Sequence, residues 1–345
     1  MKKIYLVDLV NDVVGHYHIM KALHTIAGTV ELDTKEVKYS VKTPLRFFKE
    51  RIRIIRYIAE TISKPDIQPS VVHFITADKF YFLPFLFGKK YQKHKVIATI
   101  HRIPKSPLLR LLLKWFARKV TLIIVLSDYL LQELNDMGIK NAVMVPHPAF
   151  YDCSDVSKQT LRIRNHLTDN DIVFSVLGGT RYDKGLDIVL ESFKYIPDEY
   201  KKKIILNVAG KEQDFKRSFI MDKASEYNIR LLDNIRILSD VEFKENIAVS
   251  DYILIPYRGT FNATSGPMSE AFGNGIPCIL PSHGVFKLYG IHQGKELVFE
   301  TENSESLAKC MIRVISHGVT INPDFYKRYS LRNFISKHIE LYETI

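Results

Sequence analysis

Cysteine is scarce in this 345-residue sequence, and the three that occur, Cys153, Cys278 and Cys310, lie far apart. An odd number without a Cys-x-x-Cys pair argues against both a disulfide framework and a cysteine zinc site. Long apolar runs are also missing. The most apolar stretch, 80–87, is broken by Pro84 and is far shorter than the roughly 20 residues of a membrane-spanning helix. The sequence therefore predicts a soluble or peripheral protein of the cytoplasm.

Acidic residues are in deficit. The chain has 38 Asp and Glu against 49 Lys and Arg, a net charge of +11, and the segment 89–119 holds ten Lys and Arg with no Asp or Glu. Such a balance favours an anionic partner, which is nucleic acid, acidic lipid or a phosphorylated substrate. No helix-turn-helix, zinc-finger or RNP-type pattern accompanies the charge, so nucleic acid is not predicted. We expect the basic first half to bind an anionic membrane surface.

Two of the predicted helices carry a basic stripe. In 45–58 it consists of Arg46, Lys49, Arg53 and Arg56, and in 106–118 of Arg110, Lys114 and Arg118. The apolar residues opposite are Phe47, Phe48, Ile54, Ile55 and Ile58 in the first, and Leu108, Leu112, Trp115 and Phe116 in the second. This is the pattern of amphipathic helices, and we expect both apolar sides to pack against a sheet. Anionic lipid would attract the charges with about 1 kcal/mol per basic residue.

Short β-branched runs alternate with helical patterns along the whole chain, which is typical of parallel α/β sheets. The first half predicts strands at 4–10, 71–76, 96–101, 122–127 and 143–145, and helices near 16–26, 44–62, 79–92, 106–118 and 127–137. The second half predicts strands at 172–177, 204–209, 235–238, 252–256 and 278–280, and helices near 184–195, 212–226, 241–249, 266–273 and 303–317. A polar, turn-rich stretch separates them. The sequence thus predicts two Rossmann-like domains, whose ligands would lie at the carboxyl ends of the strands.

Two cations and three glycines follow the first strand of the second half, in Leu177-Gly-Gly-Thr-Arg-Tyr-Asp-Lys-Gly185. Arg181 and Lys184 are three residues apart, and Gly185 opens a helix. Cations at a strand's carboxyl end, beside a helix N-terminus, could hold a diphosphate. The same pattern also fits an ordinary glycine turn with solvated charges, and the spacing alone does not separate the two.

A second polar loop follows the predicted strand 252–256 and leads into a helix at Ser265-Gly266-Pro267. Serine as the cap and proline in the first turn fit a helix start. Free backbone N–H groups there suit a phosphate. Glu270, one turn further on, could accept hydrogen bonds from a ribose diol, although such a residue is more often a solvated part of a helix.

Together the two segments resemble the retaining family 4 glycosyltransferases, in particular the bacterial subgroup with Arg-x-x-Lys-Gly and a Tyr-Arg…Ser-Gly loop. Their signatures, Arg…Lys-Gly and Glu-Ala…Gly-x-Pro, occur here in the same order, and Glu270 lies 86 positions after Lys184. The resemblance implies the GT-B fold, α/β with two facing Rossmann-like domains. The first would span 1–148 together with a C-terminal helix at about 324–345, and the second, nucleotide-sugar-binding domain would span 149–323.

The resemblance also implies the site residues. Arg181 and Lys184 would bind the donor diphosphate and act in catalysis together with His101, which ends a predicted strand and would lie against the donor sugar. The remaining donor-binding residues would be Gly15, which lets the backbone approach, Asn262, the amides near Ser265 and Gly266, and Glu270 at the ribose. The family usually has a second glutamate eight positions before the ribose one, where this chain has Asn262. An amide can bind a sugar hydroxyl but cannot stabilise a cationic sugar by charge.

No cofactor and no metal are expected. The Asp-x-Asp sequence, Asp169-Asn-Asp171, precedes a predicted strand and so lies at the wrong end of the sheet for a metal–diphosphate site. The resulting hypothesis is a metal-independent, retaining glycosyltransferase. It would move sugar from a nucleotide sugar, with UDP-sugar favoured over GDP-sugar, to a glycan or lipid-linked acceptor in bacterial polysaccharide synthesis. Two alternatives remain open: a nucleotide-sugar epimerase of the same fold, and a non-catalytic subunit that binds glycan or a partner enzyme.

Overall fold

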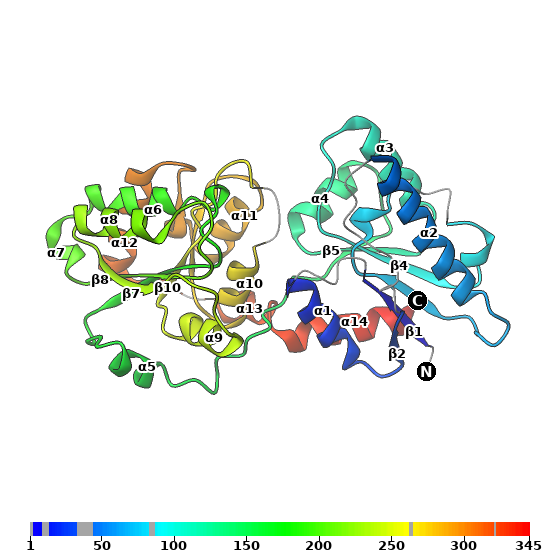
Figure 1. Ribbon diagram of the computed structural model, residues 1–345, viewed down its shortest axis with the longest axis horizontal. Coiled ribbons are helices and arrows are strands. Elements are labelled where there is room, and N and C mark those ends of the chain that lie inside the picture. The colour runs from blue at the N-terminus through cyan, green and yellow to red at the C-terminus, as the bar shows by residue number, and fades with distance from the viewer. Residues whose placement is uncertain (1–2, 9–13, 33–43, 83–86, 262–264, 321) are drawn as a thin grey trace. The chain divides into compact units, whose positions relative to one another are not determined.

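The computed structural model describes residues 3–8, 14–32, 44–82, 87–261, 265–320 and 322–345. The chain divides into two compact units. The first comprises Met1–His147 with Arg332–Ile345, and the second Pro148–Leu331 (Figure 1). Each contains a six-stranded sheet, and every strand pairing in the two sheets is parallel. The α/β class with parallel sheets is therefore as the sequence predicts.

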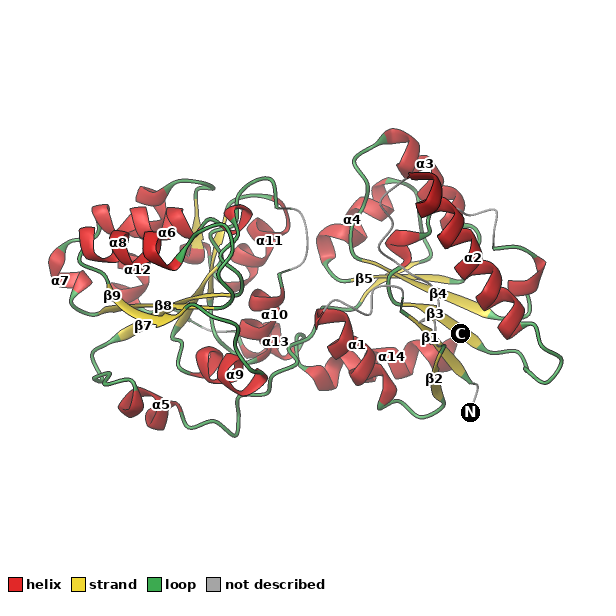
Figure 2. Cartoon of the chain, in the orientation of Figure 1, coloured by secondary structure: helices red, strands yellow, loops and turns green. Residues whose placement is uncertain are grey.

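The sheet of the first unit has the strand order β2-β1-β3-β4-β5-β6. Its strands are β1 (Ile4–Val7), β2 (Thr29–Glu31), β3 (Val71–Phe74), β4 (Lys95–Ile100), β5 (Leu122–Val125) and β6 (Ala142–Met144). Its helices are α1 (Val14–His24), α2 (Pro44–Ile62), α3 (Pro107–Ala117), α4 (Asp128–Asp136) and α14 (Leu331–Thr344). Figure 2 shows α2, α3 and α4 over one face of this sheet and α1 and α14 over the other.

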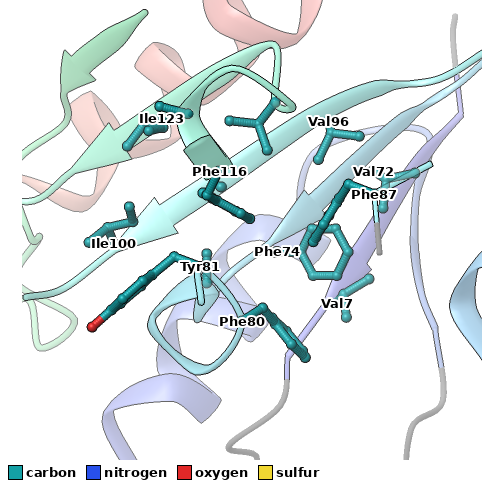
Figure 3. Packing of buried hydrophobic residues seen from close by; sticks show 14 of the residues in the cluster. Val7, Val72, Phe74, Phe80, Tyr81, Phe87, Val96, Ile100, Phe116 and Ile123 are labelled. Carbon is teal, nitrogen blue, oxygen red and sulfur yellow. The ribbon is translucent and has the colours of Figure 1, made fainter. Parts of the chain in front are cut away.

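Aromatic side chains fill the face beneath α2, α3 and α4 (Figure 3). Phe74 of β3 packs edge-on against Phe80 and Phe87, with ring centroids 5.5 and 5.4 Å apart, and Phe87 also meets Phe116 of α3 at 5.3 Å. All four rings are buried. Because side chains of a strand alternate between faces, His73 points to the other side.

There His73 attaches the C-terminal helix to the sheet. Its Nδ1 lies 2.7 Å from the hydroxyl of Tyr342 on α14, and its Nε2 lies 2.8 Å from the hydroxyl of Thr99 on β4. His338 of α14 is also buried, with its ring centroid 5.7 Å from that of His73. The last helix of the chain is thus part of the first unit, held by a buried polar network.

The sheet of the second unit has the order β12-β11-β10-β7-β8-β9. Its strands are β7 (Ile172–Leu177), β8 (Ile204–Ala209), β9 (Arg230–Asn234), β10 (Tyr252–Leu254), β11 (Cys278–Pro281) and β12 (Val298–Phe299). Its helices are α5 (Lys158–Arg164), α6 (Leu186–Ser192), α7 (Asp198–Lys201), α8 (Arg217–Glu226), α9 (Asp240–Ala248), α10 (Gly266–Gly273), α11 (Gly284–Gln293), α12 (Ser304–His317) and α13 (Pro323–Lys327).

Some elements differ from those the sequence predicts. The strand expected at 235–238 is wrong, because β9 ends at Asn234 and Ser239 already caps α9. The helix expected over 79–92 is also wrong. In the described residues this region has only two 3-10 turns, Ala77–Lys79 and Lys89–Tyr91, on either side of the Pro84 segment. Helices α5, α7 and α11 and the edge strands β2 and β12 are absent from the prediction. The single C-terminal helix expected at about 324–345 is two helices, α13 and α14.

The basic stripe of α2 is exposed and its Ile54, Ile55 and Ile58 are buried, as expected. The expectation is wrong for Phe48, which is 44% exposed, and Phe47 is only partly buried. In α3 the expectation is only partly correct. Phe116 is buried, but Leu108 and Trp115 are exposed and do not pack on the sheet. The helix is short and meets the sheet through Leu113, Phe116 and Ala117, so the side of Leu108 and Trp115 points outward.

Candidate active site

The turn after β7 is shaped by glycines at its two ends. Gly178 has φ +96° and Gly185 has φ +65°, backbone conformations that side chains other than glycine's rarely adopt. A Cβ on Gly185 would come within 2.1 Å of the Pro256 carbonyl oxygen. Only glycine lets this turn approach the end of β10, so the strand ends of β7 and β10 meet at one edge of the sheet.

Lys184 folds back over the start of this turn. A Cβ on Gly178 would lie 2.6 Å from Lys184 Nζ, and the same position is 3.7 Å from Cγ of Pro267 at the start of α10. The ammonium also lies 5.7 Å from the centroid of the Tyr257 ring. Among the described residues, no carboxylate forms an ion pair with Lys184. Its charge is therefore available to an anion at the carboxyl end of β7.

The N-terminus of α10 lies at the same place. Ser265 caps the helix, since its Oγ accepts from Met268 N at 3.3 Å and forms a hydrogen bond with the Tyr257 hydroxyl at 3.0 Å. Pro267 has no N–H, and within the described part of the chain the Gly266 N–H has no acceptor. A helix start with an uncommitted N–H next to an ammonium suits a phosphate group.

Arg181 is held by a carboxylate within the same turn. Its Nε and Nη2 donate to the two carboxylate oxygens of Asp183 at 2.8 and 2.7 Å. These hydrogen bonds lower the pKa of Asp183 below its usual range. The pairing occupies one edge of the guanidinium and leaves Nη1 for another acceptor. Arg181 is thus oriented, and partly neutralised, by Asp183.

Arg258 holds the Arg181–Lys184 turn through hydrogen bonds to its backbone, a role that is not apparent from the sequence. Its backbone N–H donates to the Asp183 carbonyl at 3.0 Å and its Nε to the Tyr182 carbonyl at 3.1 Å. Its side chain is buried and forms ion pairs with Asp187 of α6 and, at 3.2 Å, with Glu302. The only signal for it in the sequence is its place in the Tyr-Arg motif.

Glu270 lies on α10, one turn from Ser265, and its side chain is buried. Its carboxylate accepts backbone N–H groups from Phe150, at 3.0 and 3.1 Å, and from Tyr151, at 3.1 Å. Burial raises the pKa of Glu270 to about 7, although these N–H groups oppose the rise. The residue expected at the ribose therefore also fixes the segment that leads into the second unit.

Residues 157–330, just over half of the chain, match the family model described as glycosyl transferases group 1. The match spans the Arg181–Lys184 turn, the Tyr257–Ser265 loop and α10. The chain belongs to the glycosyl transferases group 1 family. It is therefore a glycosyltransferase, and the coarse part of the sequence-based identification is confirmed. No curated protein sequence matches this chain significantly.

Solved structures extend the likeness over both units. The structure of HepE from Anabaena with UDP and glucose is 12% identical, with a TM-score of 0.69 over the full length of both chains. Sucrose-phosphate synthase from Thermosynechococcus elongatus is 12% identical, with a TM-score of 0.72, and the alignment covers 100% of this chain and 99% of that one. An α,α-trehalose-phosphate synthase (UDP-forming) from Burkholderia vietnamiensis is 12% identical, with a TM-score of 0.65 over both full chains. At this identity the likeness concerns the fold, and it confirms the predicted GT-B fold.

In the first unit of this glycosyltransferase, His101 follows β4 at the carboxyl edge. Its backbone N–H donates to both carboxylate oxygens of Asp78, at 3.1 and 3.0 Å. Its Nε2 lies 2.9 Å from the Ile75 carbonyl oxygen, and because a carbonyl only accepts, Nε2 carries a proton. Gly15 is the second residue of α1. Asn262 lies outside the described residues.

The Asp-x-Asp sequence lies at the opposite edge of the second sheet. Asp171 immediately precedes β7, and its carboxylate accepts from Thr168 N and Oγ1 at 2.7 and 2.9 Å and pairs with Arg230. In the described parts of the chain, no three His, Cys, Asp or Glu side chains are grouped so that they could hold a metal ion. Nor does any helix in these parts have the length and apolarity needed to cross a membrane.

Proposed function

We propose that this glycosyltransferase moves a hexose from a nucleotide sugar to a glycan or lipid-linked acceptor, with retention of configuration and without a metal ion. The observation that carries the proposal is the ammonium of Lys184, which has no ion-pair partner among the described residues and, like Pro267 at the start of α10, lies close to Gly178. A UDP-sugar is the favoured donor, with a GDP-sugar as the alternative. The structures of HepE in complex with UDP and with UDP-glucose support this choice.

In the reaction, the bond between the anomeric carbon and the donor phosphate oxygen breaks, and the acceptor hydroxyl oxygen bonds to the same face of that carbon. The hydroxyl proton passes to the departing phosphate, and the nucleoside diphosphate leaves. Negative charge develops on the phosphate, where Lys184, Arg181 and the Gly266 N–H supply positive potential. One such group contributes about 10²–10³ to kcat in comparable sites. These groups supply the charge neutralisation that a metal would otherwise provide.

The other predicted residues are assigned the roles that the family resemblance implies. Glu270 would bind the ribose with the lone pair that Phe150 and Tyr151 leave, and His101 would contact the donor sugar. Gly15 would allow backbone approach, and Asn262 would hydrogen-bond a sugar hydroxyl. The protein would work at the cytoplasmic face of a bacterial membrane as a peripheral enzyme of surface polysaccharide synthesis.

The test is a thermal-shift panel of UDP-, GDP-, ADP- and dTDP-sugars, with and without EDTA. Wild type is compared with Lys184→Ala and with Lys309→Ala, an exposed lysine of α12 as a matched control. We expect an EDTA-insensitive rise in Tm with one nucleotide class, lost in Lys184→Ala and kept in Lys309→Ala.

A rise that EDTA abolishes would overturn metal independence. Donor isomerisation without an acceptor would identify an epimerase. The absence of any shift would support the non-catalytic reading.

A further inference from the structure

Helix α3 presents an apolar stripe to solvent. Leu108, Leu111 and Trp115 are spaced i, i+3, i+7 and so lie on one side of the helix, with 65%, 45% and 49% of their surfaces exposed. On the opposite side Leu113 and Phe116 are fully buried in the core beneath the helix. The stripe is thus the part of α3 that points away from the sheet, and none of it contributes to the core of the unit.

Cations surround the stripe. Lys105, Lys114, Arg118 and Lys119 are all exposed. Arg110 is the exception, since it turns toward Glu133 of α4 at 3.4 Å. Because 89–119 contains no Asp or Glu, no acid on this segment neutralises the others. The surface therefore combines large apolar side chains with a net positive field.

The stripe begins near the carboxyl edge of the sheet in the first unit, where His101 also lies. Helix α3 follows β4, and the helix that follows a parallel strand starts at the carboxyl end of that strand. Leu108 is the second residue of α3, and His101 is the first residue after β4.

We propose that the outward face of α3, formed by Leu108, Leu111, Trp115 and the cations beside them, inserts into the surface of an anionic lipid bilayer. The inference rests on the proposed function, because it specifies how a lipid-linked acceptor would be reached. Lysine and arginine beside exposed leucine and tryptophan match an anionic headgroup region and the acyl chains below it. A second copy of this chain is a poor occupant, since the two sets of cations would repel each other.

The experiment uses Trp115, the only tryptophan of the chain, as the reporter. The full-length protein is mixed with phosphatidylcholine vesicles containing none or about a third phosphatidylglycerol. We expect a blue shift of tryptophan emission, protection from acrylamide and quenching by lipids brominated on the acyl chains, with the anionic vesicles only. Binding should weaken as salt rises, because screening reduces the attraction between the cations and the lipid.

Two double variants keep the reporter. Leu108→Ser with Leu111→Ser should lower vesicle partition about tenfold, because the apolar contact with lipid is lost. The matched control, Leu288→Ser with Ile291→Ser, changes two residues of α11 that are 39% and 45% exposed, and it should bind like wild type. Since all four side chains are exposed by 39–65% and none is part of a core, both proteins should fold, which circular dichroism verifies.

Three results would overturn the inference: no vesicle binding, binding without a change at Trp115, and self-association that the Leu108 and Leu111 changes abolish. The donor thermal shift, measured without vesicles, separates this from the proposed function. If the shift persists and lipid binding fails, only the α3 inference is lost. If lipid binding persists but no nucleotide sugar raises the Tm, the proposed donor site is wrong and the α3 inference stands.

Discussion

Glu270 and Phe150 are 120 residues apart in the chain, yet both carboxylate oxygens of Glu270 accept the same Phe150 N–H, at 3.0 and 3.1 Å. The adjacent Tyr151 N–H adds a third hydrogen bond. Asn274, the residue that follows α10, binds the same segment: its side chain accepts a hydrogen bond from the Cys153 N–H at 2.8 Å and donates one to the Tyr151 carbonyl at 2.8 Å. One end of α10 therefore lies at the proposed phosphate site, while side chains further along fix the start of the second unit.

The pH dependence of stability should report on Glu270. Its folded pKa, about 7, lies above the ordinary 4.5, so the folded state keeps a proton that the unfolded state loses in this window. The contribution of Glu270 to the free energy of unfolding should thus fall as pH rises from 4.5 to 7, by up to about 3 kcal/mol, which appears as the difference between wild type and a variant without this group. Glu270→Gln should remove this fall. The free energy of unfolding is measured with urea at pH 5, 6, 7 and 8 for wild type and for Glu270→Gln. If the two proteins show parallel dependences on pH, the raised pKa of Glu270 is contradicted. Glu305→Gln, an exposed change on α12, is the control.

Gly178→Ala should impair catalysis more than stability. The new Cβ would lie 2.6 Å from Lys184 Nζ and would displace the ammonium, so we expect a loss of about 10² or more in kcat/KM. The positive φ of Gly178, +96°, should cost about 1–2 kcal/mol of stability. Gly138→Ala is the matched control, because φ is +80° there and nothing lies within 4 Å of the added Cβ. It should show the stability loss with normal kinetics, whereas equal activities of the two variants would argue against the assigned position of Lys184.

Arg258 is expected to act as a positioning residue. Arg258→Met would leave Asp187 without its buried partner and would release the Tyr182 carbonyl, so about 3 kcal/mol of stability should be lost. Because the turn bearing Arg181 and Lys184 loosens, donor KM should rise more than kcat falls. Steady-state kinetics and denaturant unfolding measure the two effects. Arg164→Met removes the exposed pair with Glu245 and should cost less than about 1 kcal/mol, with unchanged KM.

The attachment of α14 should be sensitive to acid. Burial lowers the pKa of His338 to about 4, and burial together with the nearby His338 lowers the pKa of His73 well below its usual value. Because the unfolded chain binds these protons first, the contribution of these two histidines to stability should be lost as pH falls below about 6.5. His338→Phe should reduce the loss between pH 7 and 4.5 by about 2 kcal/mol, while His317→Asn, an exposed change on α12, should not. Unfolding curves across this range provide the measurement.

Much of the fold was accessible from the sequence because the buried parallel strands are continuous apolar runs, which stand out between polar turns. Arg181, Lys184, Ser265 and Glu270 were accessible because they belong to two short motifs. Edge strands such as β2 and β12 were not, since two or three residues carry too little pattern. The strand expected at 235–238 lies instead at Arg230–Asn234 for a related reason. This edge strand is polar, and only its pairing with β8 fixes its position.

The sequence by itself determined the two α/β units, their parallel sheets, the family and the residues that gather at the strand ends, because local apolar periodicity and motif spacing are written in the chain. Only the tertiary structure decided what each side chain touches. It places the Lys184 ammonium over Gly178 and pairs Arg181 with Asp183. It also joins Glu270 to the Phe150 N–H and exposes Trp115, for which a core position was expected. Such contacts join residues brought together by packing, and the free energy that selects them depends on neighbours that no local pattern specifies.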